Sequence, residues 1–206
     1  MKVPQDSEAF IAEQKRILKE SPECANTSYN LGVALMEQGK LDEAIIAFNE
    51  AIENSARMFE GYVNLGYIYF KKGDLERVIE VNRKAVEIEP RYARGYANLG
   101  FAYLQLSHTD EAIGALMKAL DLNPRIVQAW NNLVNAYLQK GDVDKAIETG
   151  EKLVEIAPDF ALAHNNLAFA YYTKGEYIRA VEHVDRAISL GFEVHPEFLE
   201  KLEPHR

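Results

Sequence analysis

The sequence predicts an all-α protein, a right-handed solenoid of five 34-residue helix pairs with one further helix at each end, about twelve helices altogether. Three observations predict this fold. An asparagine recurs every 34 residues, a leucine follows each asparagine, and small residues and tyrosines recur in the same register. The asparagines are Asn30, Asn64, Asn98, Asn132 and Asn166. A fixed period of this length is typical of helix pairs stacked in one array.

The composition supports a folded protein and narrows its partners. The 206 residues carry a formal charge of −9, and 48% are hydrophobic, which is enough for a packed core. A phosphate backbone requires a basic surface, and the longest basic run is Lys71-Lys72. We therefore expect no nucleic-acid partner. With Cys24 as the single cysteine, an intramolecular disulfide is excluded.

Hydropathy predicts a cytoplasmic protein. The opening residues, MKVPQDSEAF, contain no apolar run of signal-peptide length. No window approaches the roughly 18 consecutive apolar residues that a membrane span requires. We expect no direct membrane insertion, so any peripheral position on an organelle or membrane complex would depend on protein partners.

The chain divides into seven predicted segments. They are an N-terminal cap helix or degenerate repeat at 1–24, repeats at 25–58, 59–92, 93–126, 127–160 and 161–194, and a C-terminal cap helix at 195–206. Residues 6–20 place an apolar stripe on one face of a helix, formed by Phe10, Ile11, Ile17 and Leu18. This stripe has two interpretations. It covers the apolar face of the first full repeat, or it pairs with another copy of the protein.

Each repeat is predicted to be two helices that pack closely. In the first helix, a leucine and a tyrosine three to four residues apart share one face, as in Leu65 and Tyr69. The small residue after the leucine, such as Gly66, allows the second helix to approach. Gly39, Gly73, Gly141 and Gly175 are expected to end the first helices with a positive φ, and Ser107 stands there in the third repeat. Pro90, Pro124 and Pro158 follow the second helices and stop them.

At the C-terminus a further short helix is expected. Gly191 stops the last repeat helix, and Pro196 can begin a helix that runs to Leu202.

These residues resemble the tetratricopeptide repeat, TPR, whose signature is W-x₂-L-G-x₂-Y…A-x₃-F…P. Trp130 occupies the aromatic position in the fourth copy, and Tyr62 and Tyr96 occupy it in two others. Ser28 and His164 depart from the signature there, and Phe48 alone keeps the phenylalanine. The five copies cover residues 25–194 in strict register.

The resemblance implies a peptide-binding groove. In TPR arrays the first helices line a concave face, and repeat positions 2, 5, 6, 9, 12 and 13 tend to point into it. The sixth position is asparagine in all five copies, and an amide can pair with a peptide backbone of any sequence. The alternative is a local hydrogen bond between helices. The candidate groove residues are the five asparagines with Tyr67, Phe70, Arg94, Phe101, Asn131, Asn135, Phe169 and Tyr172.

One TPR subtype is excluded as the leading function. Co-chaperones that grip acidic chaperone tails use a carboxylate clamp, which requires a lysine at the fifth repeat position. The fifth positions here are Tyr29, Val63, Ala97, Asn131 and Asn165. Because the lysine is missing, we do not expect chaperone-tail binding.

No catalytic or metal-binding pattern stands out. The five histidines do not have metal-ligand spacing, and no nucleophile elbow, phosphate-binding loop or dinucleotide turn is present. His164 occupies an aromatic position and is expected to be packed in the core. We therefore expect no enzyme activity and no cofactor or metal.

The sequence thus predicts a non-enzymatic scaffold that holds a partner peptide or helix in its groove. A homo-oligomer formed through the N-terminal helix is a further expectation. The alternative is a monomeric adaptor, or a co-chaperone-like module of a cytoplasmic complex. The acidic second helices would form a convex surface that either attracts a second partner or only keeps the protein soluble.

Overall fold

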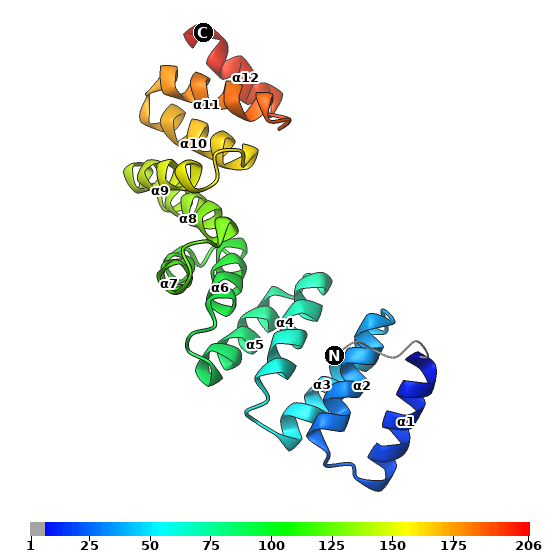
Figure 1. Ribbon diagram of the computed structural model, residues 1–206. Helices are drawn as coiled ribbons and strands as arrows, with labels where there is room; N and C mark the ends of the chain where they lie inside the picture. The colour runs from blue at the N-terminus through cyan, green and yellow to red at the C-terminus, as the bar shows by residue number, and fades with distance from the viewer. Residues whose placement is uncertain (1–6) are drawn as a thin grey trace. The chain divides into compact units, whose positions relative to one another are not determined.

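The computed structural model describes residues 7–206, and within this range the regular structure is helical throughout (Figure 1). The all-α prediction is confirmed. The first six residues of the predicted 1–24 segment lie outside the described residues. Contacts between Cα atoms divide the chain into two compact units, Met1–Arg91 and Tyr92–Arg206.

The first unit contains one end helix and two helix pairs. Its helices are α1 (Ser7–Glu20), α2 (Ala25–Glu37), α3 (Leu41–Asn54), α4 (Phe59–Lys72) and α5 (Leu75–Ile88). The pairs α2/α3 and α4/α5 pack together, and α1 packs on α2. Ile11 of α1 is buried, while Phe10, Ile17 and Leu18 are half-buried. Part of the predicted stripe therefore lies against the chain itself.

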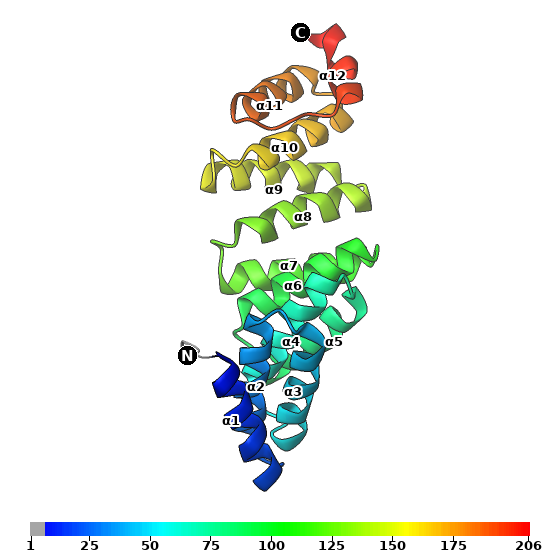
Figure 2. The same cartoon turned by 90° about the vertical axis from the view of Figure 1, so that its right-hand side faces the viewer.

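The second unit contains three helix pairs and the C-terminal helix. Its elements are α6 (Ala93–Gln105), α7 (Thr109–Leu122), α8 (Val127–Lys140), α9 (Val143–Ile156), α10 (Ala161–Lys174), α11 (Tyr177–Ser189), α12 (Pro196–Leu202) and the 3₁₀ helix η1 (Glu203–His205). Successive helices from α7 to α11 lie side by side in a stack (Figure 2). First helices of neighbouring repeats also touch, α6 with α8 and α8 with α10.

The helix ends follow the predicted chemistry. The predicted glycines have positive φ, and Ser107 takes the same left-handed conformation with a φ of 61°. A serine in this conformation stores some strain, so the turn after α6 is held by its surroundings and by the bond from the His108 backbone N–H to the Tyr103 carbonyl, 2.8 Å. Pro196 begins α12, as expected.

Close packing within a helix pair depends on a small residue on one helix that faces a large residue on the other. A Cβ on Gly32 would lie 2.7 Å from the ring of Phe48, and a Cβ on Gly100 would collide with Leu116. In the fourth repeat the corresponding residues are Val134 on α8 and Gly150 on α9, and a Cβ on Gly150 would lie 2.9 Å from Leu167 of α10. Complementary sizes at these two positions let both helices approach while the core stays filled.

Within residues 7–206, no helix is both long and apolar enough to cross a membrane.

Candidate functional site

The ladder asparagines all lie on first helices, where they have different surroundings. In the second unit, the Asn166 side-chain N–H donates to Oδ1 of Asn131 over 2.9 Å. In the first unit, the Asn64 side-chain N–H donates to the Tyr29 hydroxyl over 3.3 Å. In both cases the acceptor stands immediately before the ladder asparagine of the preceding repeat. These two amides join neighbouring first helices. They therefore have the local helix–helix role that was the alternative to peptide binding.

Asn132 differs because it has no such acceptor. The residue at the corresponding place in the preceding repeat is Ala97, whose methyl group cannot accept a hydrogen bond. The Asn132 side chain is half-exposed, and it makes no hydrogen bond to the residues that the structure describes. Its carbonyl and amino groups are therefore available to a ligand. Asn30 on α2, in the first unit, is also half-exposed and makes no hydrogen bond to the described residues. Asn98 on α6 is exposed.

The aromatic groove candidates expose a large part of their rings. Phe169 on α10 is 48% exposed, and Tyr67 and Phe70 on α4 are 48% and 51% exposed. Phe101 and Tyr172 are half-buried, as is Asn135, and Arg94 is exposed. Asn131 is only 6% exposed, and its side chain accepts a hydrogen bond from Asn166 between α8 and α10.

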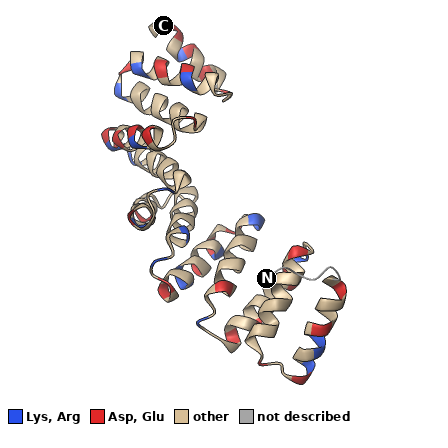
Figure 3. Cartoon of the chain, viewed as in Figure 1, with Lys and Arg blue, Asp and Glu red and all other residues tan. Residues whose placement is uncertain are grey.

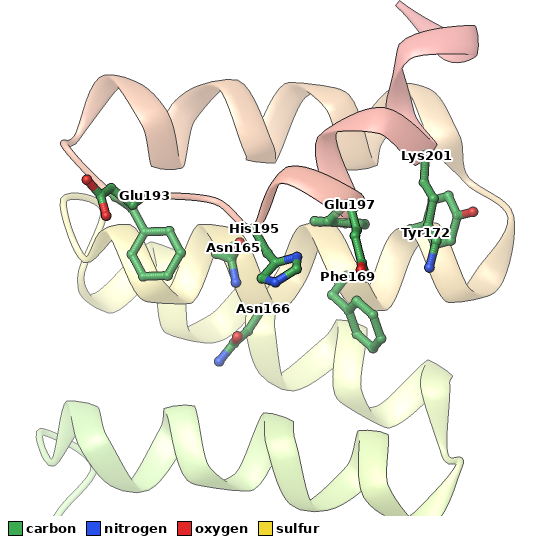
Figure 4. Close-up of a pocket in the computed structure, with 10 residues that line it drawn as sticks. Asn165, Asn166, Phe169, Tyr172, Glu193, His195, Glu197 and Lys201 are labelled. Atoms are coloured by element: carbon green, nitrogen blue, oxygen red, sulfur yellow. The ribbon is translucent and has the colours of Figure 1, made fainter.

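The C-terminal segment forms one wall of a cleft on this face (Figure 4). The cleft has a volume of about 480 Å³ and is lined on α10 by Asn165, Asn166, Phe169 and Tyr172. Opposite them lie Glu193, His195, Glu197 and Lys201 (Figure 4). The cleft therefore uses α10 residues at the predicted groove positions, and the C-terminal segment closes that end of the face.

Phe198 is a functional candidate that the sequence reasoning missed. Its ring centre lies 5.8 Å from that of Phe169 and 5.6 Å from that of Tyr172, in edge-to-face arrangements. Such pairs contribute about 0.5–1.5 kcal/mol beyond area burial. The available signal was the period, since Phe198 follows His164, at the aromatic position, by 34 residues.

Charge is unevenly distributed between first and second helices of the second unit. The first helices α6, α8 and α10 each carry a single charged residue, whereas α9 carries several (Figure 3). A face with exposed amides and rings and few charges favours backbone hydrogen bonds and apolar contacts over ion pairing.

Family models identify the repeats directly. Two models described as tetratricopeptide repeat match residues 98–161 and 161–191, respectively. A third model, described as TPR repeat, matches residues 32–73 and 66–107. The chain belongs to the tetratricopeptide-repeat family. TPR proteins form solenoids with extended concave binding surfaces, so the predicted fold class is confirmed, and the chain is a protein-interaction scaffold by family.

Solved structures of TPR proteins are similar over most of the chain. A structure of MamA is 28% identical, with a TM-score of 0.78, and the match covers 85% of this chain and all of that one, 100%. A second MamA structure is 31% identical, with a TM-score of 0.75 and coverage of 78% and 94%. YrrB, described as a TPR protein with an unusual peptide-binding site, is 22% identical with a TM-score of 0.77 and coverage of 86% and 92%, which shows the fold alone. Comparison with curated proteins finds no match.

Proposed function

We propose that this TPR protein is a non-enzymatic scaffold that holds a partner segment against the first helices α6, α8 and α10. The observation that carries the proposal is Asn132, a half-exposed amide without a hydrogen-bond partner among the described residues, on the middle helix of the three. Its amide can donate to a peptide carbonyl and accept from a peptide N–H. An amide used in this way recognises an extended backbone whatever its side chains.

Side-chain selectivity would come from the rings beside the ladder. Phe101 on α6 and Phe169 on α10 occupy the same repeat position on either side of α8, where Asn135 stands in their place. Apolar anchors of an extended peptide, or of an amphipathic helix, would pack on these rings. The segment containing α12 limits the groove beyond α10.

Groove binding is tested by removing the Asn132 amide. Affinity capture from the source cell identifies the bound partner, and titration of that purified partner then compares Asn132→Ala with wild type. We expect about tenfold weaker binding, because one exposed backbone-directed amide is worth about 1–1.5 kcal/mol. The matched control is Asn49→Ala on α3, another exposed asparagine, which should bind as wild type.

Circular dichroism must show that Asn132→Ala keeps its helical content. Undiminished binding by this folded variant would remove the ladder from the mechanism and leave the rings as the remaining determinant.

We also propose a MamA-like role, with self-assembly through α1. The similarity to two MamA structures, at 28% and 31% identity, supports it. In its size and repeat count the sequence also resembles MamA, the TPR protein that coats magnetosomes in magnetotactic bacteria. On this proposal the protein is bacterial, acts in the cytoplasm and assembles on an organelle surface. Phe10, Ile17 and Leu18 remain half-exposed on α1 and would form the contact between copies.

Size-exclusion chromatography separates assembly from a monomeric adaptor. The full chain should elute as a large species, and removal of residues 1–24 should give a single-chain mass. This is a stringent test, because the deletion exposes the apolar surface of α2 that α1 covers and so favours association. Elution of the full chain at one chain's mass would favour the adaptor.

A further inference from the structure

A second cleft lies between α7, α8 and α9, lined by residues different from those of the groove. Its volume is about 480 Å³. Its lining includes Met117 and Leu120 from α7, Trp130 and Tyr137 from α8, and Thr149 from α9. Met117 is 53% exposed, so apolar surface is accessible here. Neither the ladder asparagines nor the groove rings contribute to this cleft.

The next repeat fills the corresponding space with a ring of its own. Residues 34 positions further on are His164 for Trp130, Tyr171 for Tyr137 and His183 for Thr149. The His183 ring stacks on Tyr171, with ring centres 5.5 Å apart and planes 15° apart, and it also stacks on His164 at 5.3 Å. The side chain of residue 183 therefore occupies the place that the smaller Thr149 leaves open one repeat earlier.

The surroundings of the two places are otherwise alike. A basic side chain lies over the tyrosine ring in both, Lys145 at 5.6 Å from the Tyr137 centre and Arg179 at 5.3 Å from that of Tyr171. The Trp130 indole N–H donates to the Pro124 carbonyl over 2.8 Å. His164 Nε2–H donates to the corresponding carbonyl, Pro158, over 2.9 Å. The residues around the cleft therefore correspond to those around His183, but no ring fills the space beside Thr149.

Hydrogen bonding indicates which kind of ring the cleft accepts. A carbonyl only accepts, so Nε2 of neutral His164 carries the proton and its Nδ1 accepts from His183 Nδ1–H over 3.0 Å. Trp130 has a single N–H, which Pro124 already uses, so it offers nothing to an imidazole. Burial, the largest cause, already holds the pKa of His183 below its ordinary value. An apolar ring needs no hydrogen-bond partner, and it has no ionisable group whose charged form burial would disfavour.

The charged residues that line the cleft also favour an apolar occupant. Lys145 pairs with Asp142 over 2.8 Å, and Lys152 pairs with Glu148 over 2.7 Å. Asp121 pairs with Lys118 over 3.6 Å. Since each charged side chain of the lining already has an oppositely charged partner, an uncharged occupant matches the site electrostatically.

We propose that the cleft between α7, α8 and α9 binds the phenyl ring of a phenylalanine from a partner polypeptide, stacked on Tyr137 as His183 stacks on Tyr171. This second binding site goes beyond the groove function and does not depend on it. The stacked pair and the burial of the phenyl ring among Met117, Leu120 and Trp130 supply the affinity.

The experiment uses the single tryptophan of the chain, Trp130, as its reporter. The probe is N-acetyl-4-iodophenylalanine amide, whose heavy atom quenches indole fluorescence on contact. We expect saturable quenching of the full-length protein. Thr149→His, which supplies the ring found in the next repeat, should weaken it by at least about tenfold. Thr149→Ser keeps the space open and should bind as wild type.

Two further measurements complete the test. If Thr149→His fails to fold, Met117→Glu replaces it, since residue 117 is largely exposed and Glu151 stands at the corresponding place in the next repeat. This variant should also weaken saturable quenching. N-acetylhistidine amide should not compete with the probe. Non-saturable quenching of the wild-type protein, or saturable quenching unchanged by a folded cleft variant, would overturn the proposal.

Discussion

Replacing Gly100 by alanine is expected to lower the free energy of unfolding by about 2 kcal/mol. A Cβ at this position collides with Leu116 Cγ, a branch point within a side chain that is fully buried on α7. Because Cγ is held by packing on every side, either α6 must move away from α7 or Leu116 must leave its rotamer. Urea unfolding followed by helical circular dichroism measures the loss.

The matched control is Gly114→Ala, the same substitution on the partner helix α7. No atom lies within 4 Å of a Cβ added there, so only helix propensity changes and the stability should rise by about 0.5–1 kcal/mol. Leu116→Val should relieve the collision, since the double variant reproduces the pair formed by Ala168 and Val184 in the fifth repeat. Equal effects of Gly100→Ala and Gly114→Ala would show that close packing at residue 100 is unimportant.

The second large effect separates two ladder asparagines that the sequence makes equivalent. We expect Asn166→Ala to be less stable than Asn132→Ala by about 2 kcal/mol. Removing the Asn166 amide leaves the carbonyl of Asn131, a residue only 6% exposed, without its donor. Asn132→Ala breaks no bond within residues 7–206, and the loss of asparagine from a helix is common to both variants.

Urea midpoints of the two variants, compared at equal protein concentration, provide the measurement. The binding assay should give the opposite order, with the larger loss for Asn132→Ala. Identical stabilities would mean that the Asn166–Asn131 bond contributes nothing net in water, and the local role of the ladder would then have no energetic support.

The sequence by itself determined the helix pairs, their ends and their internal packing. These features depend on local chemistry that repeats with the chain: a left-handed residue that ends a first helix, such as Ser107, and a small residue on a first helix that faces the second helix, such as Gly32 against Phe48. Each involves residues within a single repeat, so a register of 34 residues was sufficient to place them.

Only the tertiary structure decided what the repeated residues do. Five asparagines in identical register divide into amides bonded between repeats, such as Asn166, and the unbonded amide of Asn132, because the acceptor belongs to another helix. Likewise a cleft lies beside the small Thr149, whereas the ring of His183 fills the corresponding space in the next repeat. The size of that space depends on side chains from three helices. Contacts between helices bring together residues that the 34-residue repeat does not predict to be neighbours. For that reason the binding surfaces could be described only from the packed structure.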